Sequence, residues 1–346
     1  RRYGVHSAMP MFQARKLCPH AVFLRGRMRR YAEKSAEIMR LLDSYSPLVE
    51  QASIDEAYLD ATGLERVFGS ATAMARCLQD DIRVHSGLSC SIGLAPVKFL
   101  AKIASDMRKP AGLTVLEHKD VADFLKTLPV GKIPGVGPRM VKNLELLGVR
   151  NASDVERYPL AFWRERLGKS GEHLHQRATG VDPRPVVPYT EPKSESAENT
   201  FARDTGDRAE LSVWLLRQAE RVGESLRKRG LAGRTITLKI KYADFTQHTR
   251  SRTLRTPTNS TRVIYENALA LLDQKKLERP LRLIGVGVSQ FGERERQLSL
   301  LPDPGDSARE REASLDKALD KLRHKFGRQA VMRGKLFVPR MGEERE

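Results

Sequence analysis

The spacing of apolar residues predicts that helices and short strands alternate over the first third of the chain. Helical spacing covers three segments, residues 31–42, 70–85 and 97–107. Alternating polarity predicts a strand over residues 88–95, and residues 44–62 are expected to form two extended segments around a turn at Ile54-Asp55-Glu56. Lys109-Pro110 ends the third helix, because proline cannot continue a helical hydrogen-bond pattern. This order of elements predicts an α+β sheet domain that closes near residue 118.

A helical region and an extended connection follow the first domain. Helical spacing runs from residue 121 to residue 178 and is interrupted at Pro134-Gly135-Val136-Gly137-Pro138. Residues 187–199 contain prolines, serines and glutamates but few large apolar side chains, so we predict an exposed linker there.

A second, smaller α+β domain is predicted after the linker. Its helices are expected at residues 211–229 and 261–277, and its strands at residues 235–242 and 281–291. The chain beyond residue 302 is rich in charge, and one amphipathic helix is predicted in it at residues 313–326.

Charge is the first feature that points to a partner. The 346 residues carry 61 Lys and Arg against 43 Asp and Glu, a formal net charge of +18. Residues 227–262 alone hold ten basic residues and a single acid, Asp244. A solvated surface can have this composition, but such a local excess is more often a contact surface for phosphate groups. We therefore expect a nucleic acid as the partner.

The cysteines and the hydropathy exclude other classes of protein. The three cysteines, Cys18, Cys77 and Cys90, have no paired spacing, so the sequence predicts neither a disulfide framework nor a CxxC zinc site. This usage fits a reducing compartment, and a cytoplasmic location is expected. No apolar run reaches the roughly 18 residues of a membrane span, so no membrane partner is expected.

The sharpest chemical feature is the acidic pair in Ser53-Ile54-Asp55-Glu56-Ala57-Tyr58-Leu59-Asp60. Two adjacent carboxylates at the turn of an apolar hairpin can be held by the strands and point outward. Mg²⁺ prefers such hard oxygen ligands and retains several waters, and a pair of ions can promote phosphoryl transfer. For a bare Asp-Glu pair the simpler interpretation is a solvated turn, because acidic residues favour turns.

Four segments that follow one another along the chain indicate the role of this acidic pair. Ser53 to Asp60 resembles the SIDEAYLD signature of DinB-type Y-family translesion DNA polymerases. Residues 91–95, 101–110 and 133–137 resemble later segments of the same family. The resemblance implies an α+β right-hand polymerase with these parts: partial fingers (1–27), a ferredoxin-like palm without its N-terminal strand (28–118), a helical thumb with a helix-hairpin-helix (119–186), a linker (187–199), an α+β little finger (200–292), and a clamp-binding peptide with a tail (293–346).

The resemblance also implies roles for individual residues. Asp55 and Glu56 would be catalytic carboxylates that bind two Mg²⁺ ions, with Asp55 bridging both. Lys109 and Arg1 match family residues that contact the triphosphate of an incoming deoxynucleotide. For Lys109, a competing interpretation is a lysine that stabilises the C-terminus of its helix.

The sequence departs from the family at its beginning. The family's first catalytic aspartate and its steric gate against ribonucleotides normally precede the residue matched by Arg1, and neither can be assigned here. With one of three carboxylates absent, we expect weak metal binding and little or no activity from this chain by itself. Val97 stands where the family usually carries asparagine.

Two basic regions are expected to hold DNA. Around the helix-hairpin-helix, glycine N–H groups can reach a phosphate closely, and neighbouring cations add attraction. The residues expected there are Lys132, Gly135, Gly137, Arg139 and Lys142. In the little finger, alternation places Lys239 and Lys241 on one face of a strand and apolar residues on the other. Arg250, Arg252 and Arg255 are expected to follow the DNA backbone with them.

A short peptide after the last predicted strand resembles the segment with which bacterial polymerases bind the sliding β clamp. Its candidate contacts are Gln297, Leu298, Leu300 and Leu301. A glutamine with spaced leucines in an extended segment can fill an apolar groove.

We therefore expect a monomeric, template-directed DNA polymerase of the translesion type, acting on primer-template DNA and deoxynucleoside triphosphates. Low fidelity and lesion bypass are implied by the resemblance alone. Two alternatives remain: a catalytically silent adaptor that binds DNA and clamp, and a helix-hairpin-helix nuclease. The nuclease leaves the two-domain layout around the linker unexplained.

Overall fold

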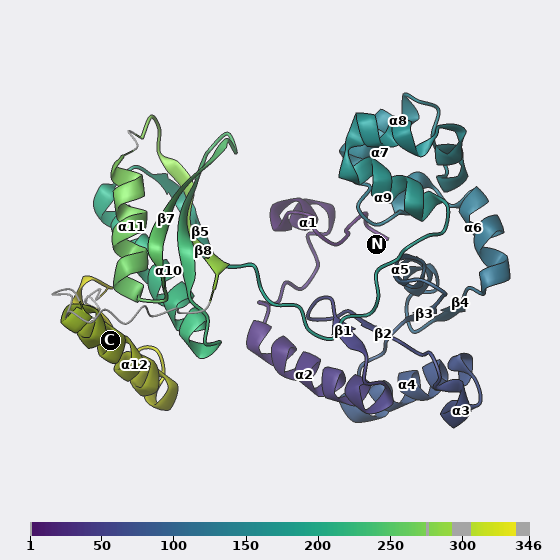
Figure 1. The fold of residues 1–346 in the computed structure, drawn as a ribbon, viewed down its shortest axis with the longest axis horizontal. Coiled ribbons are helices and arrows are strands. Elements are labelled where there is room, and N and C mark those ends of the chain that lie inside the picture. Colours follow the sequence, from purple (N-terminus) through teal and green to yellow (C-terminus); the bar gives the residue numbers. More distant parts are fainter. Residues whose placement is uncertain (1, 275–276, 293–305, 337–346) are drawn as a thin grey trace. The chain divides into compact units, whose positions relative to one another are not determined.

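The chain folds into two compact units, Arg1–Thr190 and Glu191–Glu346. The computed structural model describes residues 2–274, 277–292 and 306–336, and Figure 1 shows its ribbon. Within those ranges no helix combines the length and the apolar character that crossing a bilayer requires.

The first part of unit 1 contains short strands and the helices packed on them. Its elements are α1 (Met11–Leu17), α2 (Met28–Tyr45), β1 (Val49–Gln51), β2 (Ala57–Leu59), α3 (Glu65–Phe68), α4 (Ala71–Ser86), β3 (Ile92–Leu94), α5 (Lys98–Met107) and β4 (Leu113–Val115). Strands β1 and β2 form the antiparallel hairpin predicted around the acidic turn, while β3 and β4 pair in parallel. Leu42, Val49, Leu78 and Ile82 form the core between α2, α4 and the hairpin.

The second part of unit 1 is helical, as the sequence predicts. It contains η1 (His118–Asp120), α6 (Val121–Thr127), η2 (Val130–Lys132), α7 (Pro138–Glu145), η3 (Ala152–Arg157), α8 (Leu160–Leu167) and α9 (Lys169–Ala178). Trp163 lies fully buried in its core, and its indole N–H donates to the Val155 carbonyl at 2.9 Å. Helix α5 belongs to this core as well, because Phe99, Leu100 and Ile103 pack into it.

A polar junction joins the acidic hairpin, α5 and the end of unit 1. Lys98 at the start of α5 donates to both carboxylate oxygens of Glu50 on β1, at 2.7 and 2.6 Å, and to the Pro185 carbonyl. The Val187 N–H donates to Glu50 at 2.7 Å, and the Phe99 N–H donates to Asp182 at 3.3 Å. These bonds hold the returning chain against the hairpin and the N-terminus of α5.

Unit 2 is a four-stranded antiparallel sheet with the strand order β5-β8-β6-β7. Its elements are β5 (Ser194–Thr205), α10 (Arg208–Lys228), β6 (Gly233–Tyr242), β7 (Gln247–Thr258), α11 (Thr261–Asp273), β8 (Leu281–Phe291), α12 (Asp306–Phe326) and η4 (Gly334–Leu336). Figure 1 shows α10 and α11 beside the sheet, and their apolar residues share one core with the buried residues of the strands.

The structure corrects the predicted linker. Residues 194–199 belong to β5 and pair with β8 along their whole length, so at most residues 187–193 connect the two units. Strands β5 and β7 are the two edges of the sheet, and most of their side chains are exposed. Edge strands need few apolar residues, and their polar composition therefore resembles that of a linker.

Glu50 gives the first testable prediction. Burial alone would raise the pKa of its carboxyl, but hydrogen bonds from Lys98 and Val187 outweigh burial and lower that pKa below its ordinary value of 4.5. Replacing Glu50 by Gln should therefore lower the free energy of unfolding of unit 1 by about 2 kcal/mol near neutral pH. Because the lowered pKa makes this stabilisation disappear as pH falls, the difference from wild type should narrow below about pH 4.

Urea unfolding at several pH values measures this difference. Asp123→Asn is the matched control, because Asp123 pairs with Lys126 at the surface and the loss of that pair should change little. Equal effects of the two substitutions, or a Glu50→Gln effect that does not vary with pH, would contradict the prediction.

Candidate active site and nucleic-acid interface

The β1–β2 turn holds Asp55 and Glu56 at the tip of the hairpin. The backbone N–H groups of Ala52 and Ser53 both donate to the Glu56 carbonyl, at 2.9 and 3.1 Å, and close the turn. The Ser53 hydroxyl donates to the Asp55 carboxylate at 2.6 Å and accepts from the Asp55 N–H. Both acidic residues are exposed, so the hairpin fixes their backbone while solvent can still reach their side chains.

Lys102 of α5 connects Glu56 to a series of side chains whose charges alternate in sign. It donates to the Glu56 carboxylate and lies 3.6 Å from Asp106, which in turn pairs with Lys109 at 2.6 Å. Burial opposes the charge on Lys102, but the bond to Glu56 and the nearby Asp106 outweigh it and raise the pKa of the ammonium. Burial likewise opposes the charge on Asp106, but its two lysine neighbours lower the pKa of that carboxyl.

Lys102 was missed by the sequence interpretation, although it lies in one of the segments that carry the family resemblance. The available signal was its spacing: Lys102 and Asp106 are four residues apart and therefore share one face of α5. Its partner Glu56 lies 46 positions away in the chain, so only the fold reveals their contact.

The pair Asp55 and Glu56 fits part of a magnesium site. Mg²⁺ usually takes one or two protein carboxylates and completes its shell with water and substrate phosphates. Two adjacent, exposed carboxylates at a rigid turn meet that requirement for a shared ion. In the described ranges no group of three or more His, Cys, Asp or Glu side chains surrounds a common point, so a complete protein cage is not formed there.

A cleft next to Lys102, the partner of Glu56, reaches the predicted phosphate-binding turn. Its volume is about 590 Å³, and Lys102 and Asp106 of α5 line one part of it. Residues 131–136, which precede α7, line another part. The acidic turn therefore reaches this cleft through its contact with Lys102.

The turn at residues 134–137 has the backbone that a helix-hairpin-helix requires. Gly135 adopts φ +90°, which a residue with a side chain rarely tolerates, and a Cβ there would lie 3.2 Å from the Arg177 guanidinium. Arg177 donates to the Pro134 carbonyl and holds the turn against α9. Gly137 is the N-cap of α7 and has Pro138 after it, so the free N–H groups of the first turn face outward.

The three predicted cations around this turn are available for binding. Lys132, Arg139 and Lys142 are all exposed, and none has an ion-pair partner in the part of the chain that the structure describes. Together with the N-terminus of α7 they form a positive surface for an anion.

In unit 2 the two lysines of β6 lie on the face of the sheet that the helices leave open. Buried and half-buried residues alternate along β6, with Ile236, Leu238 and Ile240 toward the helices and Lys239 and Lys241 on the opposite face. This confirms the alternation predicted for the strand.

On this open face Lys239 reaches across the central strand. Its ammonium pairs with Glu198 of β5 at 2.6 Å, and the register places Gly285 of β8 between them. A Cβ at Gly285 would lie 2.7 Å from that of Glu198, so the strand passes beneath the ion pair without a side chain.

The structure does not bring all the predicted basic residues of unit 2 together. Arg250 and Arg252 of β7 lie opposite Leu238 and Ile236 in the register, and residues opposite each other in an antiparallel pair share a face. They therefore point to the helix side, where Arg250 donates to the Gln274 carbonyl and Arg252 to the Asn267 side chain. Arg255 is exposed and falls in the irregular stretch between Thr253 and Thr258.

Some sequence-predicted residues lie outside the described ranges. These are Arg1 and the peptide residues Gln297, Leu298, Leu300 and Leu301.

Comparison with known proteins identifies the family. The model of the impB/mucB/samB family matches residues 1–106, that of its C-terminal domain residues 192–300, and that of the IMS family HHH motif residues 118–149. DNA polymerase IV of Alkalilimnicola ehrlichii is 45% identical over 87% of this chain and 86% of its own length. DNA polymerase IV of Caulobacter vibrioides is 40% identical over 98% and 84%.

Solved structures agree with this assignment. A chimera of the Y-family DNA polymerases Dbh and Dpo4 has a TM-score of 0.75, with 28% identity over 84% of both chains. DinB from Sulfolobus solfataricus has a TM-score of 0.57, with 28% identity over 84% of this chain and 85% of its own. The chain belongs to the DinB-type Y family of DNA-directed DNA polymerases.

Proposed function

We propose that this protein extends primer 3′ ends on a DNA template by phosphoryl transfer at Asp55 and Glu56, with low fidelity and past damaged bases. The observation that carries the proposal is the contact of Glu56 with Lys102, which lines a cleft that also borders the helix-hairpin-helix turn. A similar solved structure is named an insertion ternary complex of Dbh DNA polymerase, which supports DNA and a nucleotide as the substrates.

The side chains around the turn have distinct tasks in this proposal. Asp55 and Glu56 would hold two Mg²⁺ ions together with the triphosphate, and the chemistry supplied there would be charge neutralisation and activation of the attacking hydroxyl. Ser53 fixes one carboxylate, and Lys102 holds the other on the side of α5. Lys109 binds the triphosphate, exchanging its ion pair with Asp106 for a phosphate oxygen.

The two basic surfaces would hold the DNA without reading its sequence. The turn at 134–137 offers backbone N–H groups with Lys132, Arg139 and Lys142, and the open face of the unit 2 sheet offers Lys239 and Lys241. Contacts of both kinds reach phosphates, which carry no base information. The peptide at residues 297–301 is proposed to bind the sliding β clamp on the strength of its sequence alone.

Replacing Asp55 by Asn tests the catalytic assignment. With the protein expressed from its complete reading frame, Mg²⁺-dependent primer extension should fall more than a hundredfold, because several kcal/mol of transition-state stabilisation are lost. Binding of primer-template, measured by fluorescence anisotropy, should be unchanged. Asp123→Asn makes the same chemical change at the surface and should retain full activity. If the wild-type protein binds a primer but never extends it, the adaptor replaces the polymerase as the leading function.

Lys102 gives a third prediction, because it contacts Glu56 and not the turn backbone. Lys102→Ala should lower kcat for extension about tenfold, the loss of one hydrogen bond between charged groups. The affinity for DNA should stay within a factor of about two. Lys126→Ala removes a lysine from an exposed pair and serves as the control. Equal losses in DNA affinity and in kcat would mean that Lys102 binds DNA and does not position Glu56.

The opposite faces of the unit 2 sheet give a fourth prediction. Lys239→Glu with Lys241→Glu should weaken binding to every DNA sequence and reduce the slope of log K against log salt by about two, since each phosphate contact contributes about 0.9. Arg250→Glu with Arg252→Glu makes the same change in charge on the helix side and should have a clearly smaller effect. Equal effects of both pairs would place DNA on both faces.

A further inference from the structure

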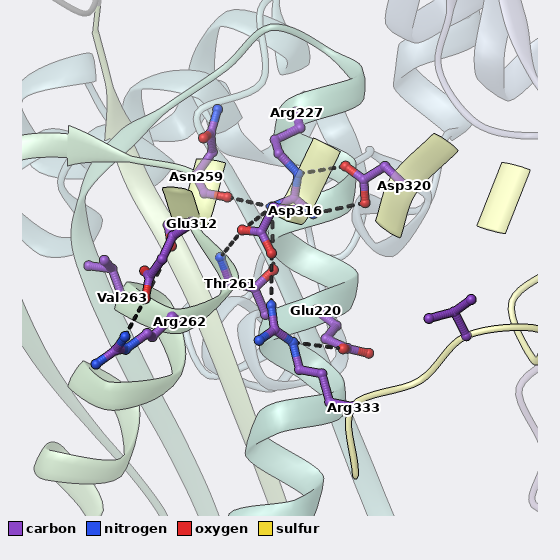
Figure 2. Close-up of polar contacts among 12 residues, drawn as sticks. Glu220, Arg227, Asn259, Thr261, Arg262, Val263, Glu312, Asp316, Asp320 and Arg333 are labelled. Carbon is purple, nitrogen blue, oxygen red and sulfur yellow. Dashed lines mark hydrogen bonds and ion pairs between the residues drawn. The ribbon is translucent and has the colours of Figure 1, made fainter. Parts of the chain in front are cut away.

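Helix α12 is attached to unit 2 by charged side chains. Figure 2 shows Arg227 of α10 between two aspartates of α12, with Asp320 at 2.6 Å and Asp316 at 3.2 Å. Asp316 also accepts from the Thr261 N–H at 2.9 Å, at the start of α11. Its side chain is 3% exposed, so this contact lies fully inside the interface between α12 and the two other helices.

Further ion pairs hold α12 in the same interface on both sides of Asp316 and Asp320. Arg323 of α12 and Arg333 beyond it both bind Glu220 of α10, at 3.0 and 3.1 Å. Glu312 pairs with Arg262 of α11. Buried ion pairs with several partners allow few alternative arrangements, since any rotation of α12 would leave a charge without its partner. The face that α12 presents to solvent is therefore fixed.

The outward residues include three of the four large apolar side chains between residues 311 and 326, and the fourth, Leu319, is half-buried. Leu315 is 49% exposed, Leu322 40% and Phe326 62%. Their spacing of seven and four residues places them on one stripe along the helix, with Ala318 beside them. A surface helix normally buries such a stripe. In α12 the stripe is exposed, and the acidic side chains lie on the inner face instead.

Between residues 311 and 326, the exposed charges of α12 are of one sign. Between residues 311 and 326 the acidic side chains, Glu312, Asp316 and Asp320, all pair with arginines of α10 and α11. The exposed ionisable side chains there are Arg311, Lys317, Lys321, His324 and Lys325. On the helix surface Lys321 and Lys325 border the apolar stripe on the side away from the ion pairs. The result is an apolar ridge with a basic margin.

We propose that this ridge, formed by Leu315, Leu322, Phe326, Lys321 and Lys325, is a docking surface for an acidic amphipathic helix of another protein. The apolar stripe fits the apolar face of such a helix, and the lysines complement its carboxylates. A nucleic acid would use the lysines but leave the leucines and Phe326 without a counterpart. The inference is independent of the polymerase chemistry, because it concerns only unit 2.

A designed peptide provides a defined probe for this surface. Its leucines repeat at positions i, i+4, i+7 and i+11, glutamates flank them, alanines fill the rest, and a fluorophore reports binding by anisotropy. The peptide should bind the wild-type protein, and the affinity should fall at least fivefold on raising the salt from about 50 to about 300 mM, because exposed charges are then screened. A permuted peptide with the same composition but no stripe should bind at least tenfold more weakly.

Two double variants and a matched control locate the contact. Leu322→Ser with Phe326→Ser, and separately Lys321→Glu with Lys325→Glu, should each weaken peptide binding at least tenfold. All four positions are exposed, so both variants should unfold at the wild-type temperature. Lys317→Glu changes a lysine farther round the helix from the stripe and should keep the affinity within twofold.

Several results would overturn the proposal. These are equal binding of the permuted peptide, no binding of the designed peptide, or unchanged affinity in both double variants. Self-association in sedimentation that the Leu322→Ser and Phe326→Ser changes abolish would assign the ridge to a second copy of the chain. Binding to anionic phospholipid vesicles that the same changes abolish would assign it to a membrane surface. Peptide binding only after removal of residues 337–346 would assign it to the chain's own end.

Discussion

The arrangement of unit 1 depends on the ion pair between Lys98 and Glu50. Glu50 lies on the first strand of the acidic hairpin, and Lys98 opens the helix whose middle carries Lys102. The same carboxylate accepts from Val187, so the chain leaving the helical region returns to the base of the hairpin. Helix α5 therefore packs its apolar face into the helical core, while Lys98 at its start contacts the hairpin. These two attachments set the distance between the acidic turn and the cleft. A shift of this one pair would move the carboxylates and the phosphate-binding turn relative to each other.

Much of this arrangement could be predicted from the sequence. The parts that could not be predicted have no local sequence pattern that determines them. The hairpin around Asp55 and Glu56, the helix after Val97 and the turn at 134–137 all have local patterns that determine them. Lys102 could not be connected with Glu56, because that contact joins residues far apart in the chain. Edge strands β5 and β7 lack an apolar repeat, so the first half of β5 was predicted as a linker and β7 was not predicted at all.

The two faces of the unit 2 sheet give a clearer example of what the local sequence cannot determine. Lys239 and Lys241 could be assigned to one face from the alternation of β6 alone. The side on which Arg250 and Arg252 lie depends on the pairing of β7 with β6, and a slip of one residue would reverse it. Likewise the helix at 313–326 was predicted as amphipathic, yet its apolar stripe faces outward. Ion pairs with arginines on α10 and α11 determine which face of the helix points outward, and those arginines are not part of the helix sequence.

The glycine beneath the Lys239 and Glu198 pair has a consequence for how freely the central strand can vary. A position on the polar face of a sheet usually accepts many residues, and β-branched ones would strengthen the sheet. Gly285 lies on that face but is buried beneath the ion pair, and even alanine there would collide with Glu198. A saturation library of this strand should therefore retain glycine there, although the side chains beside it are polar and the position lies outside the apolar core.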